Sequence, residues 1–303
     1  MNTIYFNANI SDDARRERLY AGQLFVYTAS DGTRALCAHA REMAEEAFGS
    51  LDPRYAQHDV PVDDFVAVLA TLKPKFIHHP KSKVLIQDIL KDLDSDLSKT
   101  YFDVPRLRTS TSHDYLTSGL AYVFKPHRDT WYSAPQCQLN WWLPIYDVAS
   151  DNVMAIPSRY WDRPVKNDSY DFNYQEWTQT GRKNAAKHIK SDTRKQTEAQ
   201  EELELNPQIH IVAEPGGLMI FSGAQLHSSV ANTSGQTRLS IDFRTVHLDD
   251  LKADRGAPNI DSACTGTTIN DYLSGADLTH LPDKIISRYE EMTRPTGLSR
   301  AWG

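Results

Sequence analysis

The spacing of apolar and polar positions in the first hundred residues is mainly that of amphipathic helices. Ser11 precedes two acidic residues and a helical pattern, which is typical of an N-cap. Residues 33–48 are rich in Ala, Glu and Arg and stop at a glycine, which favours the end of a helix. Two further helical patterns begin after Pro61 and after Pro80. Residues 23–29 interrupt these helices with the pattern of a β-strand.

From about residue 102 the pattern changes to short β-rich runs that are separated by turn residues. We expect strands within residues 117–124, 138–148, 152–157, 207–213, 216–221, 227–232 and 238–246. Helical patterns do not alternate with these runs, so a βαβ fold is disfavoured. The runs favour an antiparallel barrel or a double-sheet jelly roll.

A polar stretch between about residues 158 and 206 breaks this rhythm and predicts a helical insertion over the mouth of the barrel. The tail from 249 to 303 contains one clear helical pattern, at residues 282–294. We therefore expect one α+β domain over residues 1–303, with a helical part at 1–100, a β-core at about 102–157 and 207–248, the insertion, and the tail.

Composition narrows the class of protein. Hydrophobic residues make up 40% and charged residues 24% of the chain, as in ordinary soluble proteins. The net charge of −7 disfavours a general nucleic-acid binder, which needs a concentrated basic face. The longest apolar run, residues 65–72, is too short to span a membrane, and the N-terminal residues lack the pattern of a signal peptide. The 3 cysteines are widely spaced, so we expect neither a disulfide framework nor a zinc knuckle, and a reducing cytoplasm as the location.

The segment PHRDTWY contains a candidate metal motif. His127 and Asp129 are two positions apart, and side chains at this spacing on an extended segment point to the same side. Two imidazoles and one carboxylate form the facial triad of non-haem iron(II) sites, which leaves open positions for a co-substrate and O₂. His227, on a later strand pattern, supplies the second imidazole.

A His-x-Asp motif alone is weak evidence, because the chain contains a second one at His247 and Asp249. That second motif is followed by only one more histidine, His280, in a loop-like segment. We interpret it as the end of a strand, whereas a salt-linked surface turn is the alternative interpretation of His127 and Asp129.

Arg238 strengthens the first motif. It lies eleven residues after His227, and the turn-like segment between them predicts a hairpin that brings Arg238 beside the metal. A guanidinium makes bidentate, permanently charged contacts with carboxylates, so an inward Arg238 indicates an anionic co-substrate. An outward arginine on an edge strand is the alternative.

These features together resemble the iron(II)/2-oxoglutarate-dependent dioxygenases, and most closely the phytanoyl-CoA dioxygenase-like group. The segments that carry the resemblance, within residues 119–246, are HRD, QLNWWLPIYDV, NVMAIPSRY, GGLMIFSGAQLH and TRLSIDF. The resemblance implies a double-stranded β-helix fold and a reaction in which 2-oxoglutarate becomes succinate and CO₂. It implies that His127, Asp129 and His227 bind Fe(II), and that Arg238 binds the distal carboxylate of 2-oxoglutarate with help from Ser229.

The chain also departs from the pattern of this group. Arg128 stands where the group often has Gln, which argues against a coenzyme A thioester as substrate. Asp129 is present, which disfavours the halide-binding form of the site.

Further residues are candidates for ligand contact. Alternation along 138–148 places Gln138, Asn140 and Trp142 on one face, where Asn140 could hydrogen-bond 2-oxoglutarate or else face outward. Trp131 and Tyr132 follow the metal motif and fit either a substrate wall or the core. Among further candidates, Arg163 begins the insertion and fits either contact with an anionic substrate or a solvated surface.

We therefore expect an enzyme that oxidises, and most commonly hydroxylates, a small polar metabolite or natural-product intermediate. Desaturation, cyclisation or epimerisation on the same iron core stay open. Two alternatives belong to other classes. A cupin-type metal isomerase or hydrolase would keep the triad but would not need Arg238, and a non-catalytic metal-binding domain would usually have a closed, four-coordinate site. The pattern does not indicate an oligomeric state.

Overall fold

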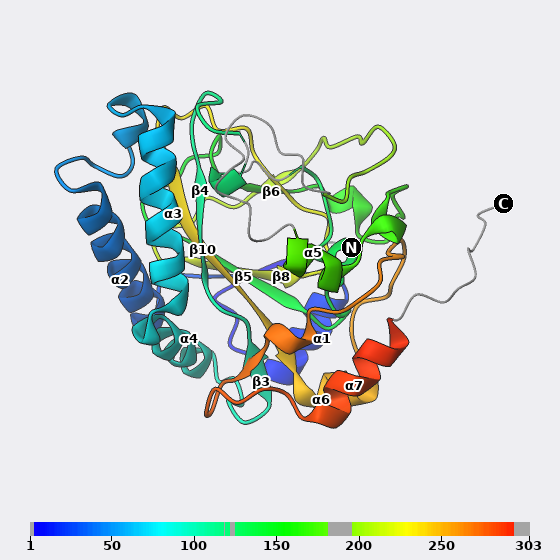
Figure 1. Ribbon diagram of the computed structural model, residues 1–303. Coiled ribbons are helices and arrows are strands. Elements are labelled where there is room, and N and C mark those ends of the chain that lie inside the picture. The colour runs from blue at the N-terminus through cyan, green and yellow to red at the C-terminus, as the bar shows by residue number, and fades with distance from the viewer. Residues whose placement is uncertain (1–2, 118, 122–124, 181–195, 294–303) are drawn as a thin grey trace.

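The helical part predicted for the first hundred residues is present in the computed structural model, which describes residues 3–117, 119–121, 125–180 and 196–293 (Figure 1). Its helices are α1 (Asp12–Tyr20), α2 (Asp31–Phe48), α3 (Val62–His78) and α4 (Pro80–Asp92). The Ser11 hydroxyl accepts a hydrogen bond from the Ala14 amide at 3.3 Å, as expected of an N-cap. Helix α2 ends at Gly49, whose φ of 65° is a backbone conformation that glycine tolerates.

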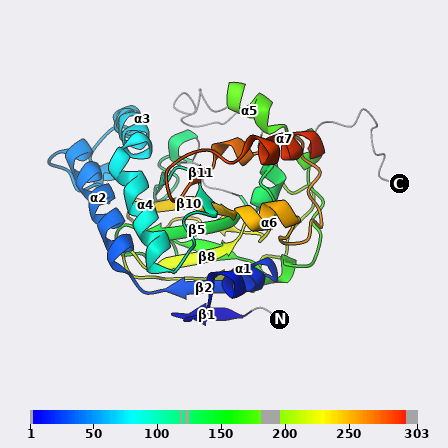
Figure 2. The same ribbon diagram turned by 90° about the horizontal axis from the view of Figure 1, so that it is seen from below.

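One large sheet, with eight strands in the described residues, forms the centre of the protein. Its order is β1 (Ile4–Phe6), β2 (Leu24–Tyr27), β8 (Leu218–Ser222), β5 (Leu139–Pro144), β10 (Arg238–His247), β3 (Thr100–Phe102) and β11 (Leu273–Ser274), with β4 (Arg106–Ser110) also paired to β10. Figure 2 shows this succession edge-on, from β1 to β11. Only β1 and β2 pair in parallel, so the sheet is mainly antiparallel.

Strand β10 shows how the two faces of this sheet differ. Leu239, Ile241 and Phe243 are fully buried in the main hydrophobic core, which also contains the apolar faces of α2, α3 and α4. The alternate positions, which include Arg238 and Arg244, point to the opposite face. The helical layer therefore leaves the polar face of β10 for the site.

A smaller three-stranded sheet packs against that second face. It consists of β7 (Ile209–His210), β6 (Met154–Ile156) and β9 (Ser228–Ser229). Val153 and Ile156 at this sheet join a second hydrophobic cluster with Trp142 and Phe221 of the large sheet. The described residues therefore form a mixed α+β fold in which two sheets face each other.

One expected strand was wrong, and two observed strands were not expected. The described part of the predicted strand 117–124 is a 3₁₀ helix at Gly119–Ala121, with the remaining positions 118 and 122–124 outside the described residues. Strands β3 and β4, just before it, were missed because both are short and β4 alternates arginines with small or apolar residues. Its arginines face the polar side of the sheet, so the pattern lacks a hydrophobic signal.

The predicted hairpin between His227 and Arg238 was also wrong. Strand β9 pairs with β6 in the small sheet, whereas β10 pairs with β3, β4 and β5 in the large one. The connection crosses between the sheets through a loop that Asn232 organises, since its Nδ2 donates to Ser110 and Gln236 carbonyls at 2.8 Å each. Arg238 therefore reaches the site from the facing sheet.

The insertion and the tail cover the remaining side. The described insertion has 3₁₀ helices at Ser158–Tyr160 and Ser169–Asp171 and the helix α5 (Tyr174–Thr180), and residues 181–195 of the predicted helical excursion lie outside the described residues. The tail contains α6 (Leu248–Ala253), a 3₁₀ helix at Ile269–Asp271, and α7 (Asp283–Met292), which confirms the predicted C-terminal helix. In the described part of the chain, none of the helices has the length and apolarity that crossing a bilayer requires.

Candidate metal and co-substrate site

The three predicted metal ligands lie together between the two sheets. His127 and His227 form an antiparallel bridge, in which each backbone amide donates to the other residue's carbonyl at 3.0 Å. The Asp129 amide donates to the Gly223 carbonyl at 2.9 Å, directly before a 3₁₀ helix at Asp129–Tyr132. Backbone contacts alone thus fix the positions from which the side chains converge.

The side chains of this triad present their ligand atoms to one another. His127 Nδ1 bonds to the Lys125 carbonyl at 2.8 Å, and His227 Nδ1 bonds to the Gln225 carbonyl at 2.9 Å. A carbonyl can only accept, so each Nδ1 carries the proton and each Nε2 carries the lone pair. The Nε2 atoms lie 3.5 Å and 3.8 Å from Asp129 Oδ1, and all three ligand atoms fall within 4.8 Å of one another.

This donor set fits iron(II). All three residues are buried, and in the described residues they form the only cluster of histidine, cysteine or acidic side chains with such geometry. Burial raises the pKa of Asp129, but the charge of Arg244 holds it well below its usual range. Two neutral imidazoles and one carboxylate are the ligands of the facial triad.

The pKa of His227 predicts a pH effect on the metal-free protein. Burial, aided by the nearby His127, lowers this pKa from 6.5 to about 4. Below pH 6.5 the unfolded chain therefore gains a proton that the folded chain does not, and the free energy of unfolding should fall by about 2 kcal/mol between pH 7 and pH 5. Urea denaturation of chelator-treated protein at pH 7 and pH 5 measures this loss. His227→Gln should reduce the difference; an equal difference in that variant would contradict the assignment.

The second oxygen of Asp129 is held by two side chains for which the sequence indicated no role. Gln138 Nε2 donates to Asp129 Oδ2 at 2.7 Å, and Arg244 Nε donates to the same oxygen at 3.3 Å. Arg244 also pairs with Asp103 at 3.1 Å. The carboxylate thus turns Oδ1 toward the histidines and Oδ2 toward the large sheet.

Arg238 is a buried cation whose guanidinium lacks an acidic partner in the described residues. One terminal nitrogen donates to the Asn152 carbonyl at 2.8 Å, and the guanidinium carbon lies 5.9 Å from the Trp142 ring centroid. The Nε atom is buried without a hydrogen-bond partner, as are the hydroxyls of Ser110 and Ser240 on the same face. Burial lowers the pKa of Arg238 to about 10, so it remains a cation at neutral pH. These orphaned donors fit a carboxylate such as the distal one of 2-oxoglutarate.

The two secondary co-substrate candidates also face the space between the sheets. Asn140 is paired with Arg244 across β5 and β10 and is buried, with its Oδ1 accepting from Gln138 at 2.8 Å. Ser229 is half-buried on β9, two positions from His227. The amide nitrogen of Asn140 and the hydroxyl of Ser229 are the groups that could contact a ligand.

The three substrate candidates lie in different places. The Tyr132 ring stands perpendicular to the His127 ring, with centroids 5.6 Å apart, and its hydroxyl donates to the Thr197 carbonyl at 2.9 Å. Trp131 is fully buried in a cluster with Tyr160, and its indole donates to Asp261 at 2.8 Å. Arg163 is exposed. Only Tyr132 among the three borders a metal-ligand candidate.

Arg128, between the two motif ligands, points away from them into a buried network. Its guanidinium donates to Asp261 Oδ2 at 2.9 Å, and to the carbonyls of Ala224 at 2.6 Å, Tyr160 at 2.5 Å and Arg163 at 3.0 Å. The Asp261 carboxylate also accepts from the Trp131 indole and the Val165 amide. Arg128 therefore ties the metal motif to the start of the insertion and to the tail.

Replacing Arg128 with glutamine should destabilise the fold. Arg128 and the Asp261 side chain are 1% and 4% exposed, so the variant leaves a buried carboxylate without its cation. Breaking a buried ion pair in this way costs about 3–5 kcal/mol. Chemical denaturation measures the loss, with Arg159→Gln, at a more exposed arginine, as the control. A loss below about 1 kcal/mol would show that the network is not a buried ion pair in solution.

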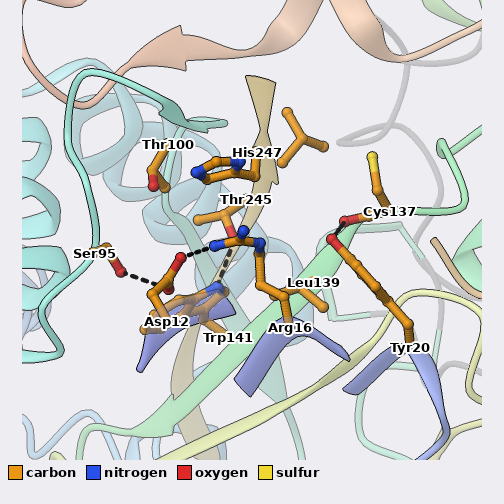
Figure 3. A pocket seen from close by; sticks show the side chains of 11 residues that line it. Asp12, Arg16, Tyr20, Ser95, Thr100, Cys137, Leu139, Trp141, Thr245 and His247 are labelled. Carbon is orange, nitrogen blue, oxygen red and sulfur yellow. Dashed lines mark hydrogen bonds and ion pairs between the residues drawn. The ribbon is translucent and has the colours of Figure 1, made fainter. Parts of the chain in front are cut away.

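The histidine of the second His-x-Asp motif lies at the end of a strand, as predicted. His247 ends β10 and points to the face opposite the triad, while exposed Asp249 pairs with Lys99 at 2.8 Å. Figure 3 shows His247 beside Thr100 and Arg16 in a small pocket that residues of α1 help to line. His247 Nδ1 and the Thr100 hydroxyl are both buried without partners there, which suits an internal water.

The sequence analysis assigned no role to several residues that surround the candidate site, namely Arg244, Asp103, Ser110, Ser240 and Gln138, of which it placed only Gln138, on one face with Asn140. Alternation from Arg238 would have placed Ser240 and Arg244 on the same inward face. Asp103 and Ser110 had no such signal, because β3 and β4 were not expected.

The family model described as "Phytanoyl-CoA dioxygenase (PhyH)" matches residues 29–240, which include all four predicted ligand positions. A search of curated proteins found no match.

Several solved structures resemble the chain distantly. EvdO2 from Micromonospora carbonacea var. aurantiaca is 11% identical with a TM-score of 0.44, over 79% of this chain and 92% of that one. The epimerase SnoN, solved with Fe³⁺, alpha ketoglutarate and nogalamycin RO, is 16% identical with a TM-score of 0.41, over 78% and 85%. The non-heme monooxygenase ThoJ is 12% identical with a TM-score of 0.43, over 77% and 76%. The reactions of these distant proteins are not transferred to this chain.

Proposed function

The chain belongs to the phytanoyl-CoA dioxygenase (PhyH) family, and from this premise we propose that it oxidises a small molecule at an iron(II) ion held by His127, Asp129 and His227. The cofactors of such an enzyme are iron(II), 2-oxoglutarate and O₂. When bound, they supply the oxidising power, and 2-oxoglutarate is converted to succinate and CO₂.

The observation that carries the proposal is the buried guanidinium of Arg238 with an orphaned Nε. A buried cation without a counter-ion is unfavourable, so the site favours an anion at this position. Arg238 and Arg244 share the inward face of β10, and Arg244 contacts Asp129, so the anion and the metal occupy one space. A dicarboxylate fits this arrangement, with one end at the metal and the other at Arg238.

We propose a separate role for each group of residues around this space. The triad holds the metal, while Arg238 orients the distal carboxylate, with the hydroxyls of Ser110 and Ser240 beside it. Asn140 and Ser229 are proposed to donate hydrogen bonds to the bound co-substrate. The apolar cluster around Trp142 and Phe221 keeps water away from this space.

The finer description of the fold is part of this proposal. Two facing sheets with the triad between them are the arrangement of a double-stranded β-helix, and the described strands support it. We propose one domain over residues 1–303, in which the insertion at about 158–206 covers the mouth of the site.

For the substrate, we propose a small polar metabolite or natural-product intermediate, processed in the cytoplasm. Tyr132 is proposed to line its binding space, because the ring packs against His127. The outcome proposed is hydroxylation; desaturation, cyclisation and epimerisation use the same iron core.

Succinate formation tests this function. Protein supplied with iron(II), 2-oxoglutarate and O₂ should release succinate, and each omission should stop it. A cupin isomerase or hydrolase would turn over its substrate without 2-oxoglutarate, and a binding domain would take up metal without turnover. Metal-dependent turnover that ignores 2-oxoglutarate would refute the proposal. A screen of amino acids, nucleosides and natural-product-like compounds for enhanced succinate release would then identify the substrate class.

A further inference from the structure

The amide of Gln138 is buried at the centre of the site with all its hydrogen-bonding atoms engaged. Its Nε2 donates to Asp129 Oδ2 at 2.7 Å and to Asn140 Oδ1 at 2.8 Å. Its Oε1 accepts from the Tyr272 hydroxyl at 2.7 Å. One side chain therefore contacts a metal-ligand candidate, a co-substrate candidate and the C-terminal tail.

The tyrosine determines which way this amide points. A carboxylate and an amide oxygen accept only, so Nε2 must face Asp129 and Asn140. Rotation by a half-turn would place Oε1 against the Asp129 carboxylate and break both bonds. Burial raises the pKa of Tyr272 well above its ordinary value, so the phenol keeps its proton and donates it to Oε1. The hydroxyl of Tyr272 is thus the contact that opposes rotation.

Backbone packing closes the remaining side. The Gly223 amide donates to the Gln138 carbonyl at 2.8 Å, and the Gly223 carbonyl accepts from the Asp129 amide. A Cβ atom at position 223 would lie 3.0 Å from Gln138 Nε2, closer than ordinary van der Waals contact. Glycine therefore permits the close approach of the amide to the turn that carries Asp129.

Two consequences follow for the ligand groups. With Oδ2 held by Gln138 and Arg244, Asp129 presents Oδ1 toward the histidines. With its Oδ1 engaged, Asn140 has its amide hydrogens directed elsewhere, as donors for a bound molecule. Both ligand groups thus take their orientation from the same amide.

We propose that Gln138, oriented by Tyr272, is a positioning residue that sets Asp129 for the metal and Asn140 for the co-substrate together. This inference rests on the proposed function, because it takes Asp129 as a metal ligand. Tyr272 lies in the C-terminal tail, beyond the residues that the family model matches. The proposal therefore means that the tail helps to orient the metal ligand Asp129.

The test measures the affinity of the full-length protein for Co²⁺. The protein is titrated with Co²⁺, and binding is followed by the visible absorption of the bound ion. Gln138→Met keeps the length of the side chain and removes the amide, and should weaken Co²⁺ binding about 10–100-fold, as is typical when a residue that orients a metal ligand is replaced. Tyr272→Phe removes one hydroxyl and should weaken Co²⁺ binding by a smaller factor, up to about tenfold. Both variants should also bind 2-oxoglutarate more weakly in the presence of Co²⁺.

Tyr20→Phe is the matched control. Tyr20 is likewise buried, and its hydroxyl donates to Asp250 at 2.8 Å on the other face of the sheet, with no metal-ligand candidate in contact. The melting temperature of the Tyr20→Phe variant should fall about as much as that of Tyr272→Phe, whereas its affinity for Co²⁺ should equal that of wild type. Equal Co²⁺ affinity in wild type, Tyr272→Phe and Gln138→Met would overturn the proposal, and a loss in Gln138→Met alone would overturn the role of Tyr272. Wild-type protein that fails to bind Co²⁺ would instead refute the proposed function.

Discussion

Replacing Arg238 with methionine is expected to lower kcat/KM for 2-oxoglutarate sharply while leaving the protein folded. The guanidinium is the proposed partner of the distal carboxylate, and truncating one member of a buried, hydrogen-bonded charge pair costs about 2–5 kcal/mol. Since about 1.4 kcal/mol corresponds to a tenfold change, kcat/KM for 2-oxoglutarate should fall about 30-fold to 3,000-fold. Initial rates of succinate release over a range of 2-oxoglutarate concentrations measure this loss.

Stability separates this effect from misfolding. Without co-substrate, Arg238 is a buried cation whose Nε lacks a partner, so the methionine variant should be as stable as wild type or more so. Addition of 2-oxoglutarate to protein already loaded with Co²⁺ should raise the melting temperature of wild type and not that of the variant. Arg34→Ala, at an exposed arginine of α2, should behave as wild type in both assays. Unchanged 2-oxoglutarate kinetics in the methionine variant would exclude Arg238 as the carboxylate partner.

Replacing Asp129 with asparagine should remove metal binding and activity together. Asparagine has the shape of aspartate but lacks the negative charge that balances the charge of the metal ion. Replacing a residue that merely orients a metal ligand already lowers metal affinity about 10–100-fold. We therefore expect a loss of at least about 100-fold in Co²⁺ affinity, with succinate release near background. Arg244 retains Asp103 as its partner, so folding should be preserved.

The second His-x-Asp motif provides the matched control for that experiment. Asp249→Asn makes the same chemical change at an exposed carboxylate that pairs with Lys99. Metal affinity and succinate release should be unchanged. Equal behaviour of the two variants would show that the triad does not bind the metal.

The triad could be predicted from sequence because its residue types and their spacing are those of a known kind of metal site, although long-range backbone contacts position it. His127 and Asp129 are two positions apart, and their side chains meet despite the 3₁₀ turn that begins at Asp129. The same turn explains why Trp131 could not be placed: outside a regular strand, alternation no longer predicts which side a residue faces. His227 and Arg238 were predicted from a later strand pattern and from the spacing between them, although the hairpin expected there does not form.

The surroundings of the triad could not be predicted, because they depend on long-range contacts. Tyr272 approaches Gln138, and Asp261 approaches Arg128, from a tail whose sequence shows only a helical pattern. The path from His227 to Arg238 was mistaken for a hairpin because its turn residues are the same in either case. Whether a loop returns to its own sheet or crosses to another depends on partners such as Ser110, which lies on a strand that was not expected.

The network around Arg128 also bears on how this sequence can diverge. An arginine at 128 is tolerated in the interior because Asp261 neutralises it, and either residue alone would leave a buried charge. Replacements at the two positions are therefore expected to occur together, with an uncharged residue at 128 accompanying an uncharged residue at 261. A substitution at position 128, inside the metal motif, is thus expected to depend on the residue at position 261, in the C-terminal tail more than a hundred positions away.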